Sequence, residues 1–178
     1  MSKLTLIATA AFGLEAVVKR ELKDLGLTIL ATENGRVTFE GTREDLVRCN
    51  LWLRCAERVQ LCIGEFEART FDELFEGTKA LDWEEWIPVD GVFPVEGKSV
   101  KSTLFSISDC QAIVKKAIAT RLGQRYGQNW LAEDGNLFTV QVALLNDRVT
   151  LTIDTSGPGL HRRGYRDHHA PAPLRDTL

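Results

Sequence analysis

The Asn34-Gly35 dipeptide is the feature that most constrains how this chain folds. Asn-Gly between two alternating apolar segments is the strongest short-range signal for a β-hairpin, because both residues adopt the left-handed conformation that a tight type I′ turn requires. The flanking segments, residues 28–32 and 36–40, are rich in residues that favour strands. The sequence therefore predicts an antiparallel hairpin near the start of the chain.

The hairpin lies in the middle of a longer mixed pattern. The elements expected around it are a strand over 4–10, a helix between Gly13 and Gly26, a helix that begins after a near capping box at Thr42, and a strand over 58–66. The second of these helices is expected to turn four apolar side chains toward the core: Leu46, Val47, Leu51 and Trp52. The order β-α-β-β-α-β is the split pattern of ferredoxin-like domains, which predicts such a domain over residues 1–66.

A second, mixed α/β unit is predicted over residues 67–166. Its expected elements are a helix after a capping box at Thr70, a strand over 92–96 with a polar exit at 97–102, a long helix capped by Ser108-Asp109, and a hairpin of residues 137–144 and 148–154. Residues 167–178 contain a Pro/Ala linker and the start of an amphipathic pattern, which we interpret as the beginning of a further domain. The expected fold class is α+β.

Composition places the chain among cytoplasmic globular proteins. No segment has the roughly 18 uninterrupted apolar residues that a membrane helix requires, and the first residues do not form a signal peptide. The four cysteines, which contain no C-x-x-C pair, are interpreted as reduced thiols of the core: Cys49, Cys55, Cys62 and Cys110.

Charge is unevenly distributed along the sequence. Residues 1–96 contain 11 Lys and Arg against 18 Asp and Glu, a net charge of −7, whereas residues 97–178 contain 11 against 7, a net of +4. The segment 97–128 holds six basic residues and one acidic residue, Asp109. Such asymmetry points to a surface that faces a polyanion, although a solvated helix face would have the same composition.

Two groups of residues are candidates for binding RNA. In the first group, Lys98 and Lys101 are expected on an exposed turn, with Ser99 and Ser102 as additional phosphate donors and with Lys115, Lys116 and Arg121 on the outward face of the following helix. The second group is Arg162, Arg163, Tyr165 and Arg166, where arginines alternate with an aromatic ring that could stack on a base. The alternative for the second group is an interdomain linker whose charges contact a neighbouring domain.

The sequence predicts no catalytic, cofactor-binding or metal-binding residue. Gly97-Lys98-Ser99 lacks the spacing of a phosphate-binding P-loop, and Gly157-Pro-Gly159 is too short for a dinucleotide fingerprint. The three histidines lie in the basic tail, away from the cysteines, which argues against both a zinc site and a Cys–His nucleophile.

The segments GKSVKSTLFSISDCQAIVKKAIATRL at 97–122, DTSGPGLHRRGYR at 154–166 and APLRDTL at 172–178 resemble the THUMP-containing 23S rRNA guanine-N2 methyltransferases. The resemblance covers essentially the whole chain. It implies a ferredoxin-like domain and a THUMP domain that together bind RNA, with the two groups of residues named above on the surface that contacts the RNA. It also implies a Rossmann-like methyltransferase domain, absent from these residues, that binds S-adenosylmethionine in the parent enzyme.

The resemblance therefore predicts the front portion of an RNA methyltransferase, inactive by itself, that positions 23S rRNA for a catalytic domain in the same polypeptide. Two alternatives stay open. THUMP domains of tRNA-modifying enzymes recognise tRNA, and the acidic residues 1–96 could instead contact a protein partner.

Overall fold

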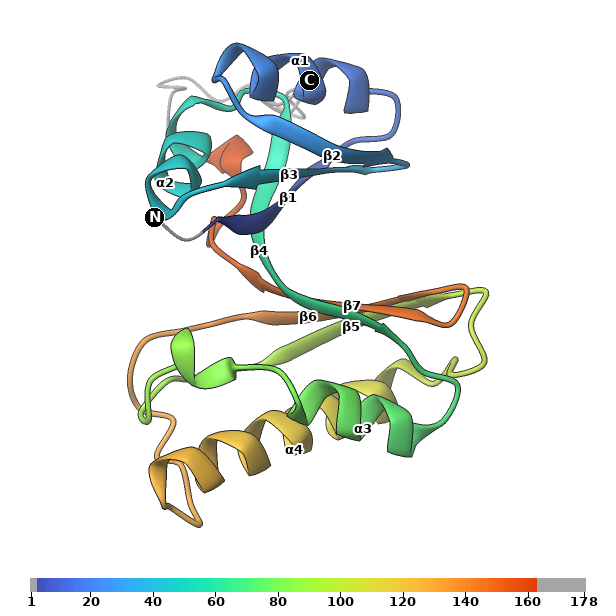
Figure 1. The fold of residues 1–178 in the computed structure, drawn as a ribbon, viewed down its shortest axis with the longest axis vertical. Helices are drawn as coiled ribbons and strands as arrows, with labels where there is room; N and C mark the ends of the chain where they lie inside the picture. The colour runs from blue at the N-terminus through green and yellow to red at the C-terminus, as the bar shows by residue number, and fades with distance from the viewer. Residues whose placement is uncertain (1–2, 163–178) are drawn as a thin grey trace, which may run out of the picture. The chain divides into compact units, whose positions relative to one another are not determined.

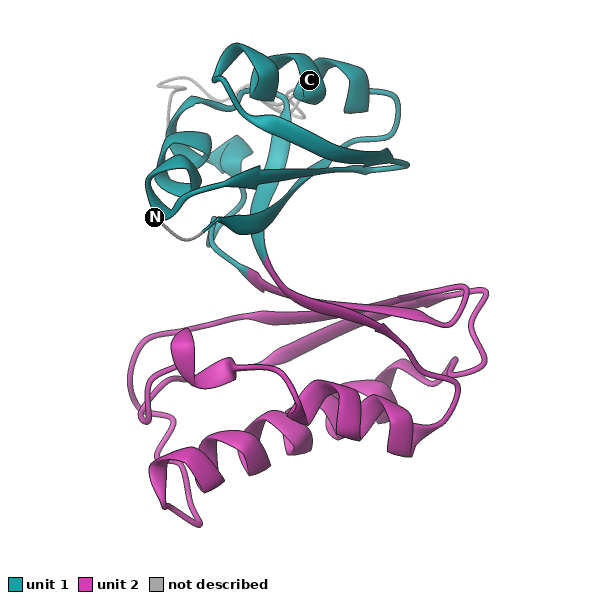
Figure 2. Ribbon diagram, in the orientation of Figure 1, with its two compact units in different colours: residues 1–61, 154–178 teal, residues 62–153 magenta. Residues whose placement is uncertain are grey.

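The computed structural model describes residues 3–162, which form two compact units. The first unit contains residues 1–61 together with 154–178, and the second contains residues 62–153 (Figure 2). The prediction placed the boundary at 66/67 and gave residues up to 166 to the second unit. In the structure strand β4, Ala56–Glu67, contributes residues to both units, and the chain returns to the first unit at Asp154.

The first unit has the predicted element order. It consists of β1 (Leu4–Ala10), α1 (Glu15–Asp24), β2 (Thr28–Glu33), β3 (Arg36–Gly41), α2 (Arg43–Trp52) and the first half of β4. The strands lie in the order β2-β3-β1-β4, and the pairings of β1 with β3 and β4 and of β2 with β3 are antiparallel. The hairpin turns at Asn34-Gly35 as predicted, but only Gly35 is left-handed, with a φ of 75°; Asn34 has no positive φ, so the turn is not of the expected type I′. This is the ferredoxin-like arrangement.

Both helices of the first unit pack on one face of its sheet (Figure 1). Alternate residues of the central strands face them, so that Leu6, Phe39 and Leu61 lie side by side in register and are buried. Thr42 and Asp45 form a complete capping box at the start of α2. The expected inward orientation of Val47, Leu51 and Trp52 is wrong, because all three are exposed; α2 buries the small Cys49 against the sheet instead.

The second unit contains the second half of β4, α3 (Phe71–Lys79), the 3-10 turn η1 (Trp83–Glu85), β5 (Val95–Val100), α4 (Ile107–Tyr126), β6 (Val140–Leu145) and β7 (Arg148–Asp154). Its strand order is β4-β7-β6-β5, with β5 parallel to β6 and β6 antiparallel to β7. The predicted strand over 92–96 begins and ends later than expected, so that Lys98 and Ser99 belong to β5 and not to a turn. Ser106, two residues before the expected cap, precedes α4.

Helices α3 and α4 cover one face of the second unit's sheet, which Figure 1 shows below the strands. The core between them is built from Leu74, Trp83, Phe93, Ile118 and Leu122, together with Val140, Val142 and Leu144 of β6. The indole of Trp83 is fully buried and donates a 2.7 Å hydrogen bond to the carbonyl of Thr78. No helix within residues 3–162 combines the length and the apolar character that crossing a membrane requires.

All four cysteines are free thiols. Cys49 and Cys110 are buried, whereas Cys55 and Cys62 are only half-buried. Burial raises the pKa of the Cys49 thiol to about 12, which makes it a poor nucleophile.

Candidate RNA interface

The basic segment 97–125 of the second unit forms strand β5, a connecting loop of residues 101–106, and helix α4. Gly97 makes this arrangement possible. A Cβ atom at this position would lie 3.1 Å from Cγ of Gln111 and 3.2 Å from a methyl carbon of Ile107, because the start of α4 crosses closely over β5. The close approach of α4 to β5 therefore favours a residue without a side chain at position 97.

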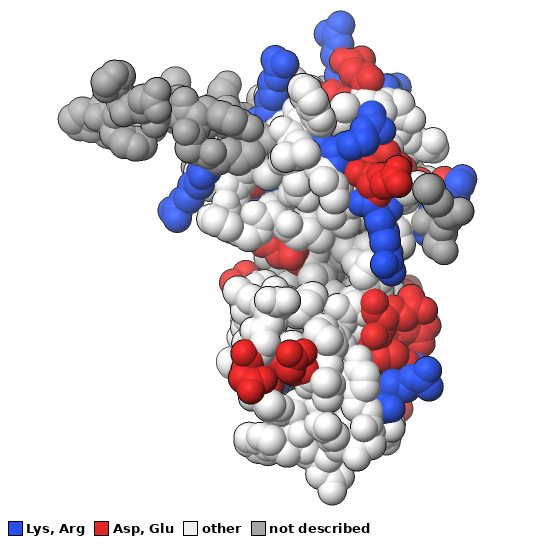
Figure 3. Space-filling view, turned by 90° about the vertical axis from the view of Figure 1, so that its left-hand side faces the viewer, with Lys and Arg blue, Asp and Glu red and all other residues white. Residues whose placement is uncertain are grey.

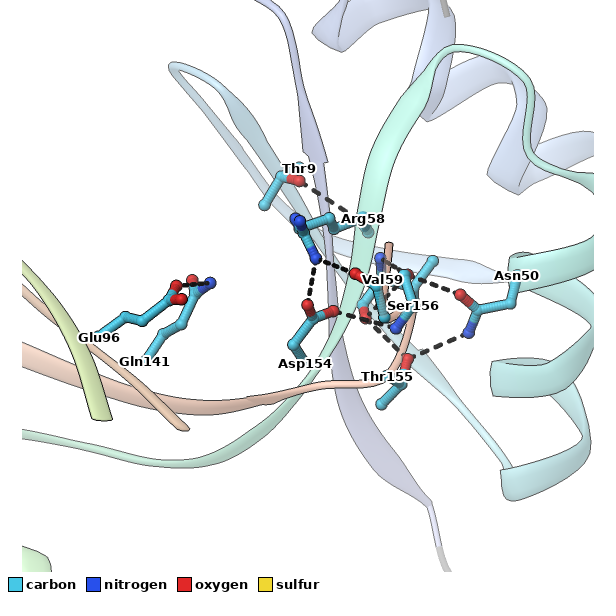
Figure 4. Close-up of polar contacts among 10 residues, drawn as sticks. Thr9, Asn50, Arg58, Val59, Glu96, Gln141, Asp154, Thr155 and Ser156 are labelled. Carbon is cyan, nitrogen blue, oxygen red and sulfur yellow. Dashed lines mark hydrogen bonds and ion pairs between the residues drawn. The ribbon is translucent and has the colours of Figure 1, made fainter. Parts of the chain in front are cut away.

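Lys98 extends from the face of the sheet opposite the helices. The buried side chains of β6, at 140, 142 and 144, point toward α4, so Gln141 and Ala143 point the other way, beside Glu96 and Lys98 in the parallel register. These residues line a shallow depression of about 190 Å³. Gln141 donates a 3.4 Å hydrogen bond from its amide to Glu96 (Figure 4). The depression thus offers an ammonium, an amide and a carboxylate on one open surface.

Asp147 holds the 101–106 loop from the β6–β7 turn. Its carboxylate accepts a 2.6 Å hydrogen bond from the backbone NH of Thr103, and its own NH donates to the hydroxyl of Ser102 over 3.0 Å. The bond from Thr103 holds the pKa of the Asp147 carboxyl below its usual range, and the guanidinium of Arg69, 3.5 Å away, adds to this effect. These hydrogen bonds fix the middle of the loop to the β6–β7 turn.

The two serines expected to donate to phosphate shape this loop instead. The Ser99 hydroxyl donates a 2.7 Å bond to the carbonyl of Leu104, and the Ser102 hydroxyl donates to the carbonyl of Val100. Since a hydroxyl has one proton to donate, neither has a second one for a phosphate in this arrangement. Lys101 lies between them with a left-handed φ of 48° and an exposed side chain.

The expected outward orientation of two cations on α4 is wrong. The Lys115 ammonium, 35% exposed at the side chain, donates to the carbonyl of Phe93 (3.0 Å) and to Glu133 (2.6 Å), and lies 3.6 Å from the centre of the Phe93 ring. The reason is position: residue 115 lies on the edge of the buried stripe of α4, next to Val114, where its long side chain reaches the loop before β6.

Arg121 is likewise engaged within the domain. Its guanidinium makes two hydrogen bonds to Glu84, of 3.0 and 2.7 Å, and one of 2.7 Å to Asp82. At about 100° per residue, position 121 lies roughly 20° from Val114 around the helix, on the stripe that faces η1. The Arg121 guanidinium holds the pKa of Glu84 below its usual range, and Arg125, 3.7 Å from Glu84, contributes further.

Three cations of the segment have no ion pair within residues 3–162: Lys98, Lys101 and Lys116. Lys116 is exposed on α4, 6.0 Å from the centre of the Phe75 ring. Basic side chains do not gather on every face: the side of the second unit shown in Figure 3 is largely uncharged, with a few acidic clusters and basic side-chain atoms at its right-hand edge. The positive charge available to contact RNA is therefore smaller than the six cations of segment 97–128 indicate, and it is confined to fewer positions.

The second candidate group lies mostly outside the described residues. Arg163, Tyr165 and Arg166 are among the residues that the structure does not describe. Arg162 ends the short 3-10 turn η2, Leu160–Arg162, where it is exposed and its backbone NH donates to the carbonyl of Gly159.

A polar network within the first unit fixes the chain just before this group (Figure 4). Asp154 forms an ion pair with Arg58, which also donates to the carbonyl of Gly157. Asn50 of α2 donates to the Thr155 hydroxyl over 3.0 Å and accepts from the Ser156 hydroxyl over 2.6 Å. The segment that leads into Gly157-Pro-Gly159 is thus held against α2 and β4 by contacts that the Gly-Pro-Gly pattern by itself did not indicate.

The fold and these surfaces define a ferredoxin-like domain followed by a domain of the THUMP type. Residues 5–60 match the family model of the RlmL ferredoxin-like domain, and residues 68–154 match that of the THUMP domain. The chain belongs to the THUMP-domain proteins that carry an RlmL-type ferredoxin-like domain.

Curated relatives extend over more residues than this chain. It is 51% identical along its whole length to the "Putative RNA methyltransferase YpsC" of Bacillus subtilis, of which it spans 46%. It is 34% identical to the ribosomal RNA large subunit methyltransferase K/L of Marinobacter nauticus, of which it spans 25%. The chain therefore spans less than half the length of both relatives.

Solved structures share the same fold. A protein of Listeria monocytogenes described as a "predicted N6-adenine-specific DNA methylase" is 56% identical, with a TM-score of 0.94 over 99% of this chain and 47% of that protein. SMU.472, described as a "putative methyltransferase complexed with SAH", is 45% identical with a TM-score of 0.92 over the same shares.

Proposed function

We propose that this chain is the RNA-binding N-terminal portion of an S-adenosylmethionine-dependent rRNA methyltransferase, which positions structured 23S rRNA for guanine-N2 methylation by a further domain. The relatives named as RNA and ribosomal RNA methyltransferases support the class of enzyme. The relative bound to SAH, the product of methyl transfer from S-adenosylmethionine, supports the cofactor.

The observation that carries the proposal is the state of Lys98 and Lys101. Both are exposed and without an ion pair within residues 3–162, on adjoining parts of a THUMP-type domain. Free ammonium groups hold nucleic-acid phosphates without reading sequence. Lys116, Arg162, Arg163, Tyr165 and Arg166 are proposed as further RNA contacts, whereas Lys115 and Arg121 are proposed to stabilise the domain.

The chemistry of methyl transfer is assigned to the remainder of the longer protein. S-adenosylmethionine supplies the electrophilic methyl group when it is bound. A Rossmann-like site for it uses a Gly-rich loop between a strand and the start of a helix, and within residues 3–162 Gly97 does not fit this pattern, because it lies inside β5. This chain by itself is expected to bind RNA and to transfer no methyl group.

The proposal is tested by measuring binding to a fluorescently labelled 23S rRNA fragment over a range of salt concentrations. The logarithm of the affinity should fall linearly with the logarithm of the salt concentration. The double variant Lys98→Ala/Lys101→Ala should bind more weakly, and its salt slope should be smaller by up to about 2, since each lost phosphate contact removes about 0.7–0.9 from the slope.

The matched control is Lys19→Ala/Lys23→Ala on α1, which makes the same change in net charge in the first unit. Equal losses in the two double variants, or a flat salt dependence of the unchanged chain, would contradict the proposal. Tighter binding to tRNA than to the rRNA fragment would favour the tRNA alternative. Equal binding to a DNA duplex would mean that the surface does not select RNA.

A further inference from the structure

Phe105 is the most conspicuous feature of the loop between β5 and α4. Its side chain is 82% exposed, although the preceding residue, Leu104, is buried in the core of the second unit. A single exposed apolar residue requires no explanation by itself. Phe105 differs because of the way the loop presents it.

The loop holds Phe105 outward by several fixed contacts on its N-terminal side. Leu104 is anchored in the core, and its carbonyl accepts the hydrogen bond from Ser99. Thr103 is bound to the Asp147 carboxylate, and Lys101 keeps a left-handed backbone that a non-glycine residue adopts at a cost. Helix α4 begins two residues after Phe105 and fixes the other end. An aromatic ring held in this way loses little conformational entropy when a flat partner packs on it.

The surroundings of the ring define the chemistry of that partner. Lys101, an exposed cation without an ion pair within residues 3–162, precedes the ring on the same loop, whereas Lys98 extends from the face of the sheet opposite α4. The loop thus presents an exposed aromatic ring and an exposed cation four residues apart. An unpaired nucleotide has the matching groups, a flat base and an anionic phosphate.

We propose that Phe105 stacks on an unpaired base of the RNA while Lys101 of the same loop contacts the adjacent phosphate. This inference rests on the proposed RNA-binding function and adds to it that the RNA segment recognised at this loop is single-stranded. A paired base inside a helix is already stacked on both faces and does not offer a face to the ring.

The test compares two labelled RNAs of equal length, a hairpin with an unpaired loop and a fully paired duplex, with the full chain and its variants. Phe105→Ala should weaken binding of the hairpin by about 5- to 150-fold, the range for loss of one base–aromatic stack, and should leave binding of the duplex unchanged. Phe105→Leu, which keeps an apolar side chain, should lose most of the same affinity. Phe105→Trp should retain it and should show quenching of the added indole fluorescence on binding.

Phe12→Ala is the matched control, because Phe12 is 84% exposed in the first unit. It should bind both RNAs as the unchanged chain does. Unchanged thermal unfolding of Phe105→Ala shows that the loop variant folds, as expected for an exposed ring.

The results separate this inference from the proposed function. If Phe105→Ala binds the hairpin normally while Lys98→Ala/Lys101→Ala binds it weakly, RNA binding stands and the stacking role is wrong. If Phe105→Ala weakens hairpin and duplex equally, Phe105 does not select unpaired bases and the inference is also wrong. If the unchanged chain binds neither RNA, the proposed function fails and this inference fails with it.

Discussion

Lys115 and Lys116 are neighbours in sequence with opposite roles in the structure, and replacing each by methionine tests the assignment. Methionine keeps most of the apolar stem and removes the ammonium group. Lys115 loses its bonds to the Phe93 carbonyl and to Glu133 and its position over the Phe93 ring. Lys116 loses only a long contact, 6.0 Å to the centre of the Phe75 ring.

The magnitude follows from what is left without a partner. A hydrogen bond to a charged group contributes about 1.5–3 kcal/mol, a partly exposed ion pair about 0.2–1 kcal/mol, and a cation over an aromatic face about 0.5–2 kcal/mol. These contributions overlap and water reaches part of the site. We therefore expect Lys115→Met to lower the free energy of unfolding by roughly 2 kcal/mol. For Lys116→Met, the expected change is within about 0.5 kcal/mol, as for most surface substitutions.

Urea unfolding measures the stability and the salt titration of RNA binding measures the function. Lys115→Met should lower the urea midpoint at an unchanged slope and should leave the salt dependence of RNA binding unaltered. Lys116→Met should leave the urea midpoint nearly unchanged and should reduce the salt slope of RNA binding. Equal stability of the two variants, or a smaller salt slope for Lys115→Met, would refute the assignment of Lys115 as a structural residue.

Two further predictions concern ionisable groups of the first unit. The pKa of the Asp45 carboxyl is lowered, chiefly by the hydrogen bond from the backbone NH of Thr42. The stability that this carboxylate contributes is therefore present above its ordinary pKa of 3.8 and is lost as the pH falls through the lower pKa of the folded state. In urea unfolding at a series of acid pH values, Asp45→Asn should flatten the dependence of stability on pH below about pH 4. The thiol of Cys49, with a pKa of about 12, should stay unmodified by a thiol reagent at pH 8 in the folded chain and should react only in denaturant. Labelling of Cys49 in the folded chain at the rate of a free thiol would contradict its burial.

The elements of the fold were largely predictable because their signals are local. The Asn34-Gly35 turn, the capping boxes at Thr42 and Thr70, and the alternating apolar residues of the strands lie within a few residues of what they specify. The unit boundary was less predictable. It depends on the pairing of β4 and on the contacts of Asp154 to Ser156 with Asn50 and Arg58, which are about a hundred residues apart in sequence.

The orientation of side chains was the weakest part of the prediction. Val47, Leu51 and Trp52 are apolar yet exposed, while Arg121 is charged yet lies on the buried side of its helix. A helical wheel centred on Val114 would have placed Arg121 on the core stripe, but only the packing of η1 shows that Glu84 and Asp82 are there to pair with it. Phe105 had no signal in the sequence, because its exposure depends on Leu104 being the residue that the loop buries.

These pairings change where the positive charge of the second unit acts. Segment 97–128 has six cations by sequence, but Lys115 is paired with Glu133, and Arg121 and Arg125 lie beside Glu84. Two of the acidic residues before the segment, Asp82 and Glu84, thus neutralise the cations in the second half of α4. The cations of the segment left without an ion pair within residues 3–162 are Lys98, Lys101 and Lys116, and Lys101 shares its loop with the exposed ring of Phe105. A few localised cations and one exposed aromatic ring suit a few nucleotides of single-stranded RNA better than the long backbone of a duplex. Variants of the 101–106 loop should therefore change both the salt slope of binding and the preference for an RNA with an unpaired loop.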